Sequence, residues 1–275
     1  FRELSSVDRL TNEKIARVMA EIISGQTPKE QSVDVLDIGA GGGRSVRFFV
    51  NHLRQKGIVQ SVHFRWLDKD PNHVKGLKKA AQELTWPFSA EVVHKKWEND
   101  KPPKKYDFIM LNHVIYYFKA KQYDALFKKM LGHLKTRGTL FIVVRTKDED
   151  YAFIKEFYER VKKKPFNEAI FEDAIAVIER LNKGDLDIQR RFRSALISFP
   201  FGISNFAVQS LIEFYMRTPW DQIPDSLKEE MTIYLKAPER DGKLRQTDGI
   251  LIITKLGKDL KNGKPVSKGV IYKRT

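Results

Sequence analysis

The stretch at residues 33–44, Val-Asp-Val-Leu-Asp-Ile-Gly-Ala-Gly-Gly-Gly-Arg, most constrains what this chain can fold into. A β-branched apolar run reaches the acidic residue Asp37 and is followed by four glycines within the five positions 39–43. This pattern is typical of a strand, a tight loop and a helix, in that order. Glycines in such a loop permit positive φ and a close approach of the backbone to a ligand, and amides at the start of the helix can face that ligand. The stretch therefore predicts a nucleotide-binding corner.

The spacing of the glycines bears on which ligand binds. The dinucleotide fingerprint G-x-G-x-x-G needs a small residue at position 44, where this chain has Arg44, so NAD is disfavoured. The phosphate loop G-x-x-x-x-G-K-[ST] is absent, so ATP or GTP hydrolysis has no sequence support. The segment at 37–41 resembles the first motif of class I S-adenosylmethionine-dependent methyltransferases. The resemblance implies that Gly39, Ala40 and Gly41 contact the methionine part of S-adenosylmethionine and that Asp37 helps to place its ammonium. A glycine-rich turn without a ligand is the alternative.

Composition sets broad limits. The 275 residues, 41% of them hydrophobic, are enough for one large domain or for a domain with an insertion. Cysteine does not occur, which excludes disulfides, thiol catalysis and a Cys-ligated zinc site within this sequence and suits the cytoplasmic location that we expect. We find no apolar run near the roughly 20 residues that cross a bilayer and no signal-peptide pattern. We therefore expect no membrane partner.

The formal net charge of +15 invites a nucleic-acid partner. Most lysines are scattered over predicted helix faces and loops, however, where an ordinary solvated surface explains them. Only residues 256–275 form a dense basic tail. We therefore expect a small-molecule substrate and a monomeric protein, with RNA binding kept as an alternative.

Strand and helix patterns alternate from residue 33 to residue 144, which implies parallel strands with helical crossovers. The predicted fold class is α/β, a seven-stranded, mostly parallel, doubly wound sheet. The expected strands are 33–38, 61–67, 91–94, 106–111, 138–144, 195–199 and 249–254. Amphipathic helices are expected before the first strand and at 151–161 and 169–181. A further helical block at 201–240 would sit over the carboxyl edge of the sheet, where a substrate lid is useful.

Ligands of open α/β sheets bind at the carboxyl ends of the strands. Asp68 ends the second strand and is the predicted acceptor of the ribose hydroxyls. Asp70 is the alternative, although it precedes Pro71 and suits a helix cap. His73, one turn later, either lies beside the cofactor or is a surface residue.

Two further strand ends carry candidate residues. After the third strand, the loop that passes the adenine in methyltransferases contains Trp97 and Glu98. The fourth strand ends in Asn112 and His113, where the transferred methyl would emerge, and aromatic residues that include Tyr117 follow. Packing beneath the sheet is the alternative for these aromatic residues.

Three segments resemble histamine N-methyltransferase and its relatives more closely than class I enzymes in general. They are 108–118 (Phe-Ile-Met-Leu-Asn-His-Val-Ile-Tyr-Tyr-Phe), 127–131 (Phe-Lys-Lys-Met-Leu) and 242–244 (Gly-Lys-Leu). The resemblance implies N-methylation of a small amine or imidazole. The resemblance covers most of residues 33–254. We expect one methyltransferase domain over 1–255, with a helical cap at 1–30, the insertion at 201–240 as a substrate lid and the basic tail at 256–275 outside it.

The resemblance also assigns roles residue by residue. The residues implied to contact the cofactor are Asp37, Gly39, Ala40, Gly41, Asp68, His73, Glu98 and Asn112. Those implied to contact the substrate are Glu13, His113, Tyr117 and Asp248. His113 stands where the family has Gln, and Asp248 lies near a family Asn, so histamine itself is not specified.

A mechanism follows from these assignments. A protonated amine must lose its proton before it attacks a methyl group, and His113 has a suitable intrinsic pKa to accept that proton. Asp248 or Glu13 would attract the cationic amine; the alternative is that His113 only packs beside Tyr117. The motif H-E-x-x-H is absent and the histidines lack metal-ligand spacing, so we expect no metal. An RNA methyltransferase and a non-catalytic methyltransferase-like protein remain the other candidate classes.

Overall fold

The computed structural model describes residues 13, 15–25, 32–56, 61–147, 149–166, 171–198, 205–238 and 243–257. Within this part of the chain, seven strands form one sheet in the order β3-β2-β1-β4-β5-β7-β6. The strands are β1 Val33–Ile38, β2 Val62–Asp68, β3 Phe88–His94, β4 Tyr106–Asn112, β5 Leu134–Arg145, β6 Leu186–Ser198 and β7 Lys243–Lys255. The α-helices are α2 Arg44–Gln55, α3 Pro71–Gln82, α4 Tyr123–Gly132, α5 Glu149–Lys162, α6 Phe171–Leu181, α7 Asn205–Met216 and α8 Asp225–Lys236, and residues 15–25 are also helical. The predicted fold class is confirmed.

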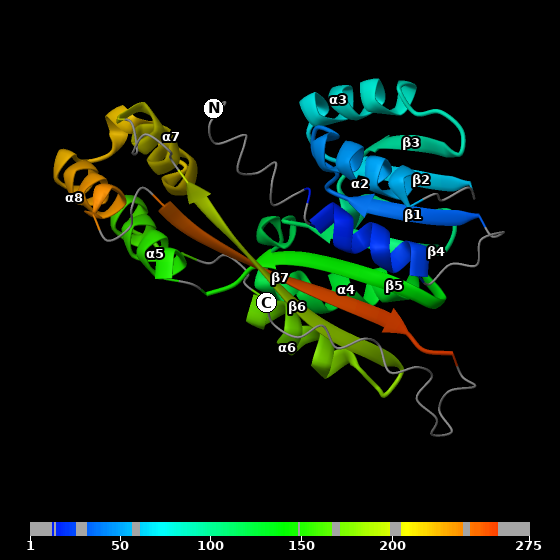
Figure 1. The fold of residues 1–275 in the computed structure, drawn as a ribbon. Coiled ribbons are helices and arrows are strands. Elements are labelled where there is room, and N and C mark those ends of the chain that lie inside the picture. Colours follow the sequence, from blue (N-terminus) through cyan, green and yellow to red (C-terminus); the bar gives the residue numbers. More distant parts are fainter. Residues whose placement is uncertain are drawn as a thin grey trace.

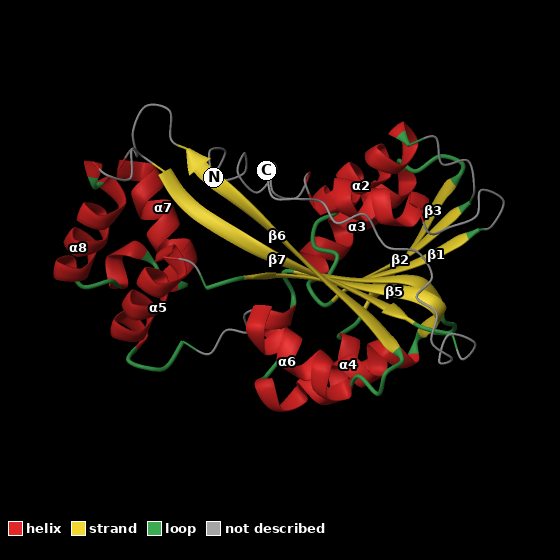
Figure 2. Cartoon of the chain, turned by 60° about the horizontal axis from the view of Figure 1, so that its bottom comes forward, coloured by secondary structure: helices red, strands yellow, loops and turns green. Residues whose placement is uncertain are grey.

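The sheet is parallel from β3 to β5, and β7 runs antiparallel to both of its neighbours. Helices cover both faces (Figure 2): α2, α3 and the helix at 15–25 pack on one, α4 and α6 on the other. The strand period of two divides the buried side chains between these layers, because successive residues point to opposite faces. In β5, for example, Phe141 and Val143 join the first core, while Leu140, Ile142 and Val144 join the second.

The last two strands continue beyond the sheet. The ladder of β5 with β7 ends at Arg145↔Asp248, and the Thr146 N–H still donates to the Thr247 carbonyl oxygen. The ladder of β7 with β6 continues further, with residues 243–247 opposite residues 194–198. The two strands therefore leave the carboxyl edge as a two-stranded ribbon, which reaches α7 (Figure 1). Helices α5, α7 and α8 form a third hydrophobic core, which we call the helical module. Arg145 connects it to the sheet, because its guanidinium lies 5.9 and 5.7 Å from the ring centroids of Tyr151 in α5 and Tyr215 in α7.

The structure corrects the bounds of four strands and the extent of the helical block. The fifth strand begins at Leu134 rather than at residue 138, and the seventh begins at Lys243 rather than at residue 249. The sixth strand spans Leu186–Ser198 rather than 195–199, and the third begins at Phe88 rather than at residue 91. Arg190, Arg191 and Arg193 interrupt the hydrophobic alternation of β6, which β7 nevertheless pairs along its whole length. The helical block also includes α5, which precedes β6 in the chain.

Two other expectations concern the ends of the chain and the membrane. The predicted N-terminal cap is described only from residue 13, and most of the basic tail lies outside the described residues. No helix in the described part of the chain has the length and apolar character needed to cross a membrane.

Candidate functional site

The glycine loop after β1 is tied to the end of β2. The N–H groups of Gly39 and Ala40 both donate to the Leu67 carbonyl oxygen, at 2.7 and 3.1 Å. The Gly41 N–H donates to Asp68 Oδ2 at 2.9 Å. The loop thus places its backbone directly beside a buried carboxylate at the carboxyl edge of the sheet.

The loop glycines at 39 and 41 have different surroundings. Both have positive φ, +73° and +62°, which disfavours a side chain. A Cβ on Gly39 would lie 2.5 Å from Val114 Cγ2, so Gly39 is required for packing. A Cβ on Gly41 would meet nothing within 4 Å. Gly41 therefore presents its backbone to open space, where a ligand can approach it.

Two acidic residues lie beneath this loop. Asp37 and Asp68 are only 4% and 7% exposed. Burial, with a smaller contribution from the charge of Asp68, raises the pKa of Asp37 to about 7. The site therefore carries concentrated negative potential, which a cationic ligand group such as an ammonium would relieve.

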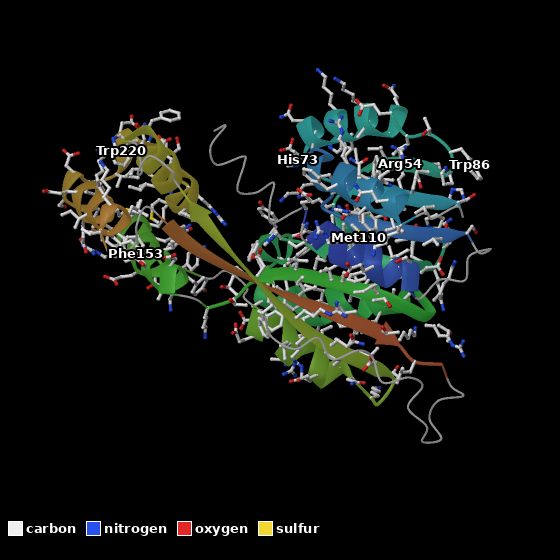
Figure 3. All side chains as sticks on the ribbon, in the orientation of Figure 1. Arg54, His73, Trp86, Met110, Phe153 and Trp220 are labelled. Atoms are coloured by element: carbon white, nitrogen blue, oxygen red, sulfur yellow. The ribbon has the colours of Figure 1, made fainter. Side chains whose placement is uncertain are left out.

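Helix α3 begins beside Asp68. The second Asp68 oxygen, Oδ1, accepts the Asp70 N–H at 2.9 Å and lies 3.4 Å from His73 Nδ1. Figure 3 shows His73 at the end of α3 that faces the helical module, whereas Trp86 lies at the opposite side of the sheet. Asp70 is the N-cap of α3, since its side chain accepts the Asn72 N–H at 2.8 Å. The cap interpretation of Asp70 is confirmed.

The ends of β4 and β7 bring together two residues that are far apart in the sequence. His113 Nε2 lies 3.6 Å from Asp248 Oδ2, and Asp248 is 0% exposed. The sheet order explains this approach, because β5 is the strand between β4 and β7 and the His113 N–H donates to its Val143 carbonyl at 2.9 Å. His113 adopts φ +53°, an uncommon conformation for a residue other than glycine. Next to it, Asn112 Oδ1 is buried and accepts no hydrogen bond from any residue that the structure describes.

Tyr116 is a neighbour of His113 that sequence reasoning missed. Its hydroxyl oxygen accepts the Arg145 N–H at 2.8 Å and lies 3.2 Å from His113 Nδ1. The two rings stack with their centroids 6.1 Å apart. No simple spacing reveals the pair in the sequence, because His113 precedes the 3₁₀-helix Ile115–Tyr117 and has a positive φ. Both ring nitrogens of His113 therefore face polar groups.

The remaining predicted residues differ in how exposed they are and in which contacts they form. Tyr117 is 65% exposed, with Lys69 Nζ 5.0 Å from its ring centroid. Glu98 is exposed in the short 3₁₀-helix Trp97–Asn99, whereas the neighbouring Trp97 is buried in the core beneath the sheet. Glu13 forms no hydrogen bond or ion pair with any other described residue, so the structure does not connect it to the site.

The arrangement fits S-adenosylmethionine better than a metal ion. Gly41 offers an accessible backbone, Asp68 a carboxylate at a strand end, and Asn112 a buried oxygen that can accept a hydrogen bond. Across the described residues, no three His, Asp or Glu side chains come together as a metal site.

Comparisons with known proteins agree with this geometry. The methyltransferase domain family matches residues 9–184. No curated protein matches the sequence significantly. Among solved structures, the chain is similar to loganic acid methyltransferase with bound S-adenosylhomocysteine, at 14% identity and TM-score 0.61, over 93% of this chain and 96% of that one.

Two further structures share the fold. The plantazolicin methyltransferase BpumL, also with S-adenosylhomocysteine, is 14% identical with TM-score 0.52, over 93% of this chain and 90% of that one. A protein from Galdieria sulphuraria, provisionally assigned as a sarcosine dimethylglycine methyltransferase, is 18% identical with TM-score 0.52, over 88% and 86%. The chain therefore belongs to the methyltransferase domain family, with the class I fold and S-adenosylmethionine as its cofactor.

Proposed function

We propose that this protein transfers a methyl group to a nitrogen of a small amine or imidazole-type molecule. The observation that carries the proposal is the pair formed by His113 and the buried Asp248 at the carboxyl edge, next to Asn112. The resemblance of residues 108–118 to histamine N-methyltransferase supports the same class of acceptor. The assignment of the similar Galdieria sulphuraria protein to sarcosine and dimethylglycine, both small amines, is also in keeping with it.

Residues on the cofactor side have a defined task in this proposal. When bound, S-adenosylmethionine supplies a methyl group on a sulfonium, which a neutral nitrogen can attack in line. The residues that would hold it are Asp37, Gly39, Ala40, Gly41, Asp68, His73, Glu98 and Asn112. Asp68 would accept ribose hydroxyls, Asp37 would face the ammonium, and Asn112 would accept a hydrogen bond at its buried oxygen.

On the acceptor side, the main requirement is to neutralise a protonated amine. Asp248 favours the approach of a cation by its charge. An ionised Asp248 requires the facing His113 Nε2 to carry a proton, so a further proton enters the ring at Nδ1, 3.2 Å from the Tyr116 hydroxyl oxygen. His113 would thus receive the amine proton on the side of Tyr116, and Asp248 would stabilise the resulting imidazolium.

A cofactor-consumption assay tests the proposal. Purified protein is given S-adenosylmethionine and a panel of amines, imidazoles and RNA, and formation of S-adenosylhomocysteine is followed. We expect turnover with one or more small nitrogen compounds and none with RNA. Turnover only with RNA, or with none of the panel although the cofactor binds, would refute the proposal.

Variants then assign the acceptor residues. His113→Ala should lower kcat by roughly 100-fold while cofactor affinity stays near that of the wild type. His63→Ala is the matched control, because His63 lies near the amino end of β2, where its Nδ1 is 2.7 Å from Ser89 Oγ. Wild-type turnover in His113→Ala would make His113 structural.

A further inference from the structure

The segment between β3 and β4 is attached directly to the cofactor corner. The Lys95 N–H donates to the Asp68 carbonyl oxygen at 3.0 Å. The 3₁₀-helix Trp97–Asn99 follows and leaves Glu98 exposed. Any movement of residues 95–100, which we call the β3 loop, would therefore act on the surroundings of Asp68.

Lys129 of α4 reaches under this loop. Its Nζ lies 2.5 Å from the Trp97 carbonyl oxygen, 2.7 Å from that of Asp100 and 3.3 Å from that of Glu98. It also lies 4.2 Å from the centroid of the Trp97 ring. One ammonium group thus holds both ends of the turn and the residue between them.

The chemistry of this contact is specific to lysine. An ammonium has three donors on one atom, which can converge on three carbonyl oxygens, whereas the planar fork of arginine spreads its donors apart. Burial lowers the pKa of Lys129, against the opposing charges of Asp100 and Glu98. Partial burial of the Lys129 ammonium therefore costs desolvation free energy, a cost that a fully exposed lysine does not have.

A second cation, the buried Arg65, fixes the end of the loop. Asp100 is 2% exposed, and its Oδ1 lies 3.0 Å from Arg65 Nη2. Arg65 comes from β2, three residues before Asp68, and its Nη1 lies 2.5 Å from Glu91 Oε2. Lys129 from the helical layer and Arg65 from the sheet therefore hold the loop from two directions.

We propose that Lys129 is a positioning residue for cofactor binding, which holds the β3 loop in the arrangement that the cofactor meets beside Asp68. The proposal rests on the assignment of the cofactor and not on the identity of the methyl acceptor. Without Lys129, cofactor binding must also order the loop, and that cost weakens affinity.

Calorimetry with S-adenosylhomocysteine as the probe tests this role, together with the thermal midpoint of each variant. Lys129→Met should raise the Kd by about tenfold and speed hydrogen exchange at the Asn99 and Asp100 amides, which close the turn. Lys129→Arg keeps the charge and should give an intermediate Kd, which preserves a test if Lys129→Met does not fold. For any acceptor found, kcat at saturating cofactor should stay within about twofold of wild type.

Two matched controls separate positioning from general stability. Lys128→Met removes an exposed charge from the same helix and should leave the Kd unchanged. Lys135→Met removes a lysine that contacts Asp34 and Asp107 at 3.1 and 2.8 Å near the amino ends of β1 and β4, so it should lower the thermal midpoint without changing the Kd. A wild-type Kd in Lys129→Met, or an equal increase in Lys135→Met, would overturn the inference. Absence of binding by the wild type would overturn the cofactor assignment itself.

Discussion

Replacing Asp37 with Asn should remove a pH dependence of stability that runs opposite to that of most carboxylates. Burial and the nearby charge of Asp68 raise the pKa of Asp37 from 3.8 to about 7. Between these values the folded chain keeps a proton that the unfolded chain has lost, so the free energy of unfolding falls as pH rises. At ~1.36 kcal/mol per pH unit over roughly three units, the total fall is about 4 kcal/mol. In the variant Asp37→Asn, the side chain at position 37 is neutral at every pH. The free energy of unfolding of Asp37→Asn, relative to that of the wild type, should therefore increase by up to about 4 kcal/mol as the pH rises through this range.

Urea denaturation of the cofactor-free protein from about pH 4.5 to about pH 8 measures this difference. Asp34→Asn is the matched control in the same strand. Burial by itself would raise the pKa of Asp34, but the Lys104 and Lys135 ammonium groups outweigh it and lower that pKa. The contribution of Asp34 to the free energy of unfolding is therefore constant through the upper part of this pH range and is lost only in acid. The same pH slope in wild type and Asp37→Asn would refute the reasoning. An ammonium of the cofactor facing Asp37 would favour the carboxylate. Because the ionised fraction of a group with a pKa of about 7 rises about fivefold from pH 6 to pH 7, the affinity for S-adenosylhomocysteine should rise by up to about fivefold over this range.

Three further substitutions test the geometry of the corner. Asp68→Asn should weaken binding of S-adenosylhomocysteine by on the order of 1.5–3 kcal/mol in calorimetry, because charged hydrogen bonds are lost, and unchanged affinity would place the ribose contact elsewhere. Gly39→Ala should lower the free energy of unfolding by about 1–3 kcal/mol, since its Cβ would lie 2.5 Å from Val114 Cγ2, and adding Val114→Ala should restore the steric part. Asp70→Ala should cost about 1 kcal/mol of stability through loss of the α3 cap, with cofactor affinity retained; a large loss of affinity would instead assign Asp70 to the site.

The parallel half of the fold was predictable because local pattern and tertiary environment agree there. Strands such as β1 and β4 bury apolar residues on both faces; Gly39 follows the last residue of β1, and β4 ends at Asn112. The start of β6 was missed because three arginines stand on an edge strand, where pairing with β7 overrides the hydrophobic pattern. Membership of α5 in the helical module depends on contacts with α7 and α8, which follow much later in the chain. No local signal carries that information.

Some residues of the candidate site could likewise be predicted from the sequence, and others could not. Residues adjacent to strand ends, such as Asp68 and His113, could be named from sequence because topology places strand ends at one edge. The approach of Asp248 to His113 requires the position of β7 beside β5, which the sequence shows only through resemblance. Lys129 was not recognised, because a lysine on an amphipathic helix is ordinarily a surface residue and its carbonyl partners lie about 30 positions away.

The separate core of the helical module affects how this protein unfolds. Residues of α5, α7 and α8 bury their side chains among themselves, and the sheet has two cores of its own. Units with separate cores can unfold independently of each other. We therefore expect differential scanning calorimetry to show two overlapping unfolding transitions rather than one with a single thermal midpoint. Substitutions inside the module can therefore change its packing while the glycine corner stays formed. In evolutionary terms, the module can diverge in sequence at little cost to the half of the molecule that forms the cofactor corner.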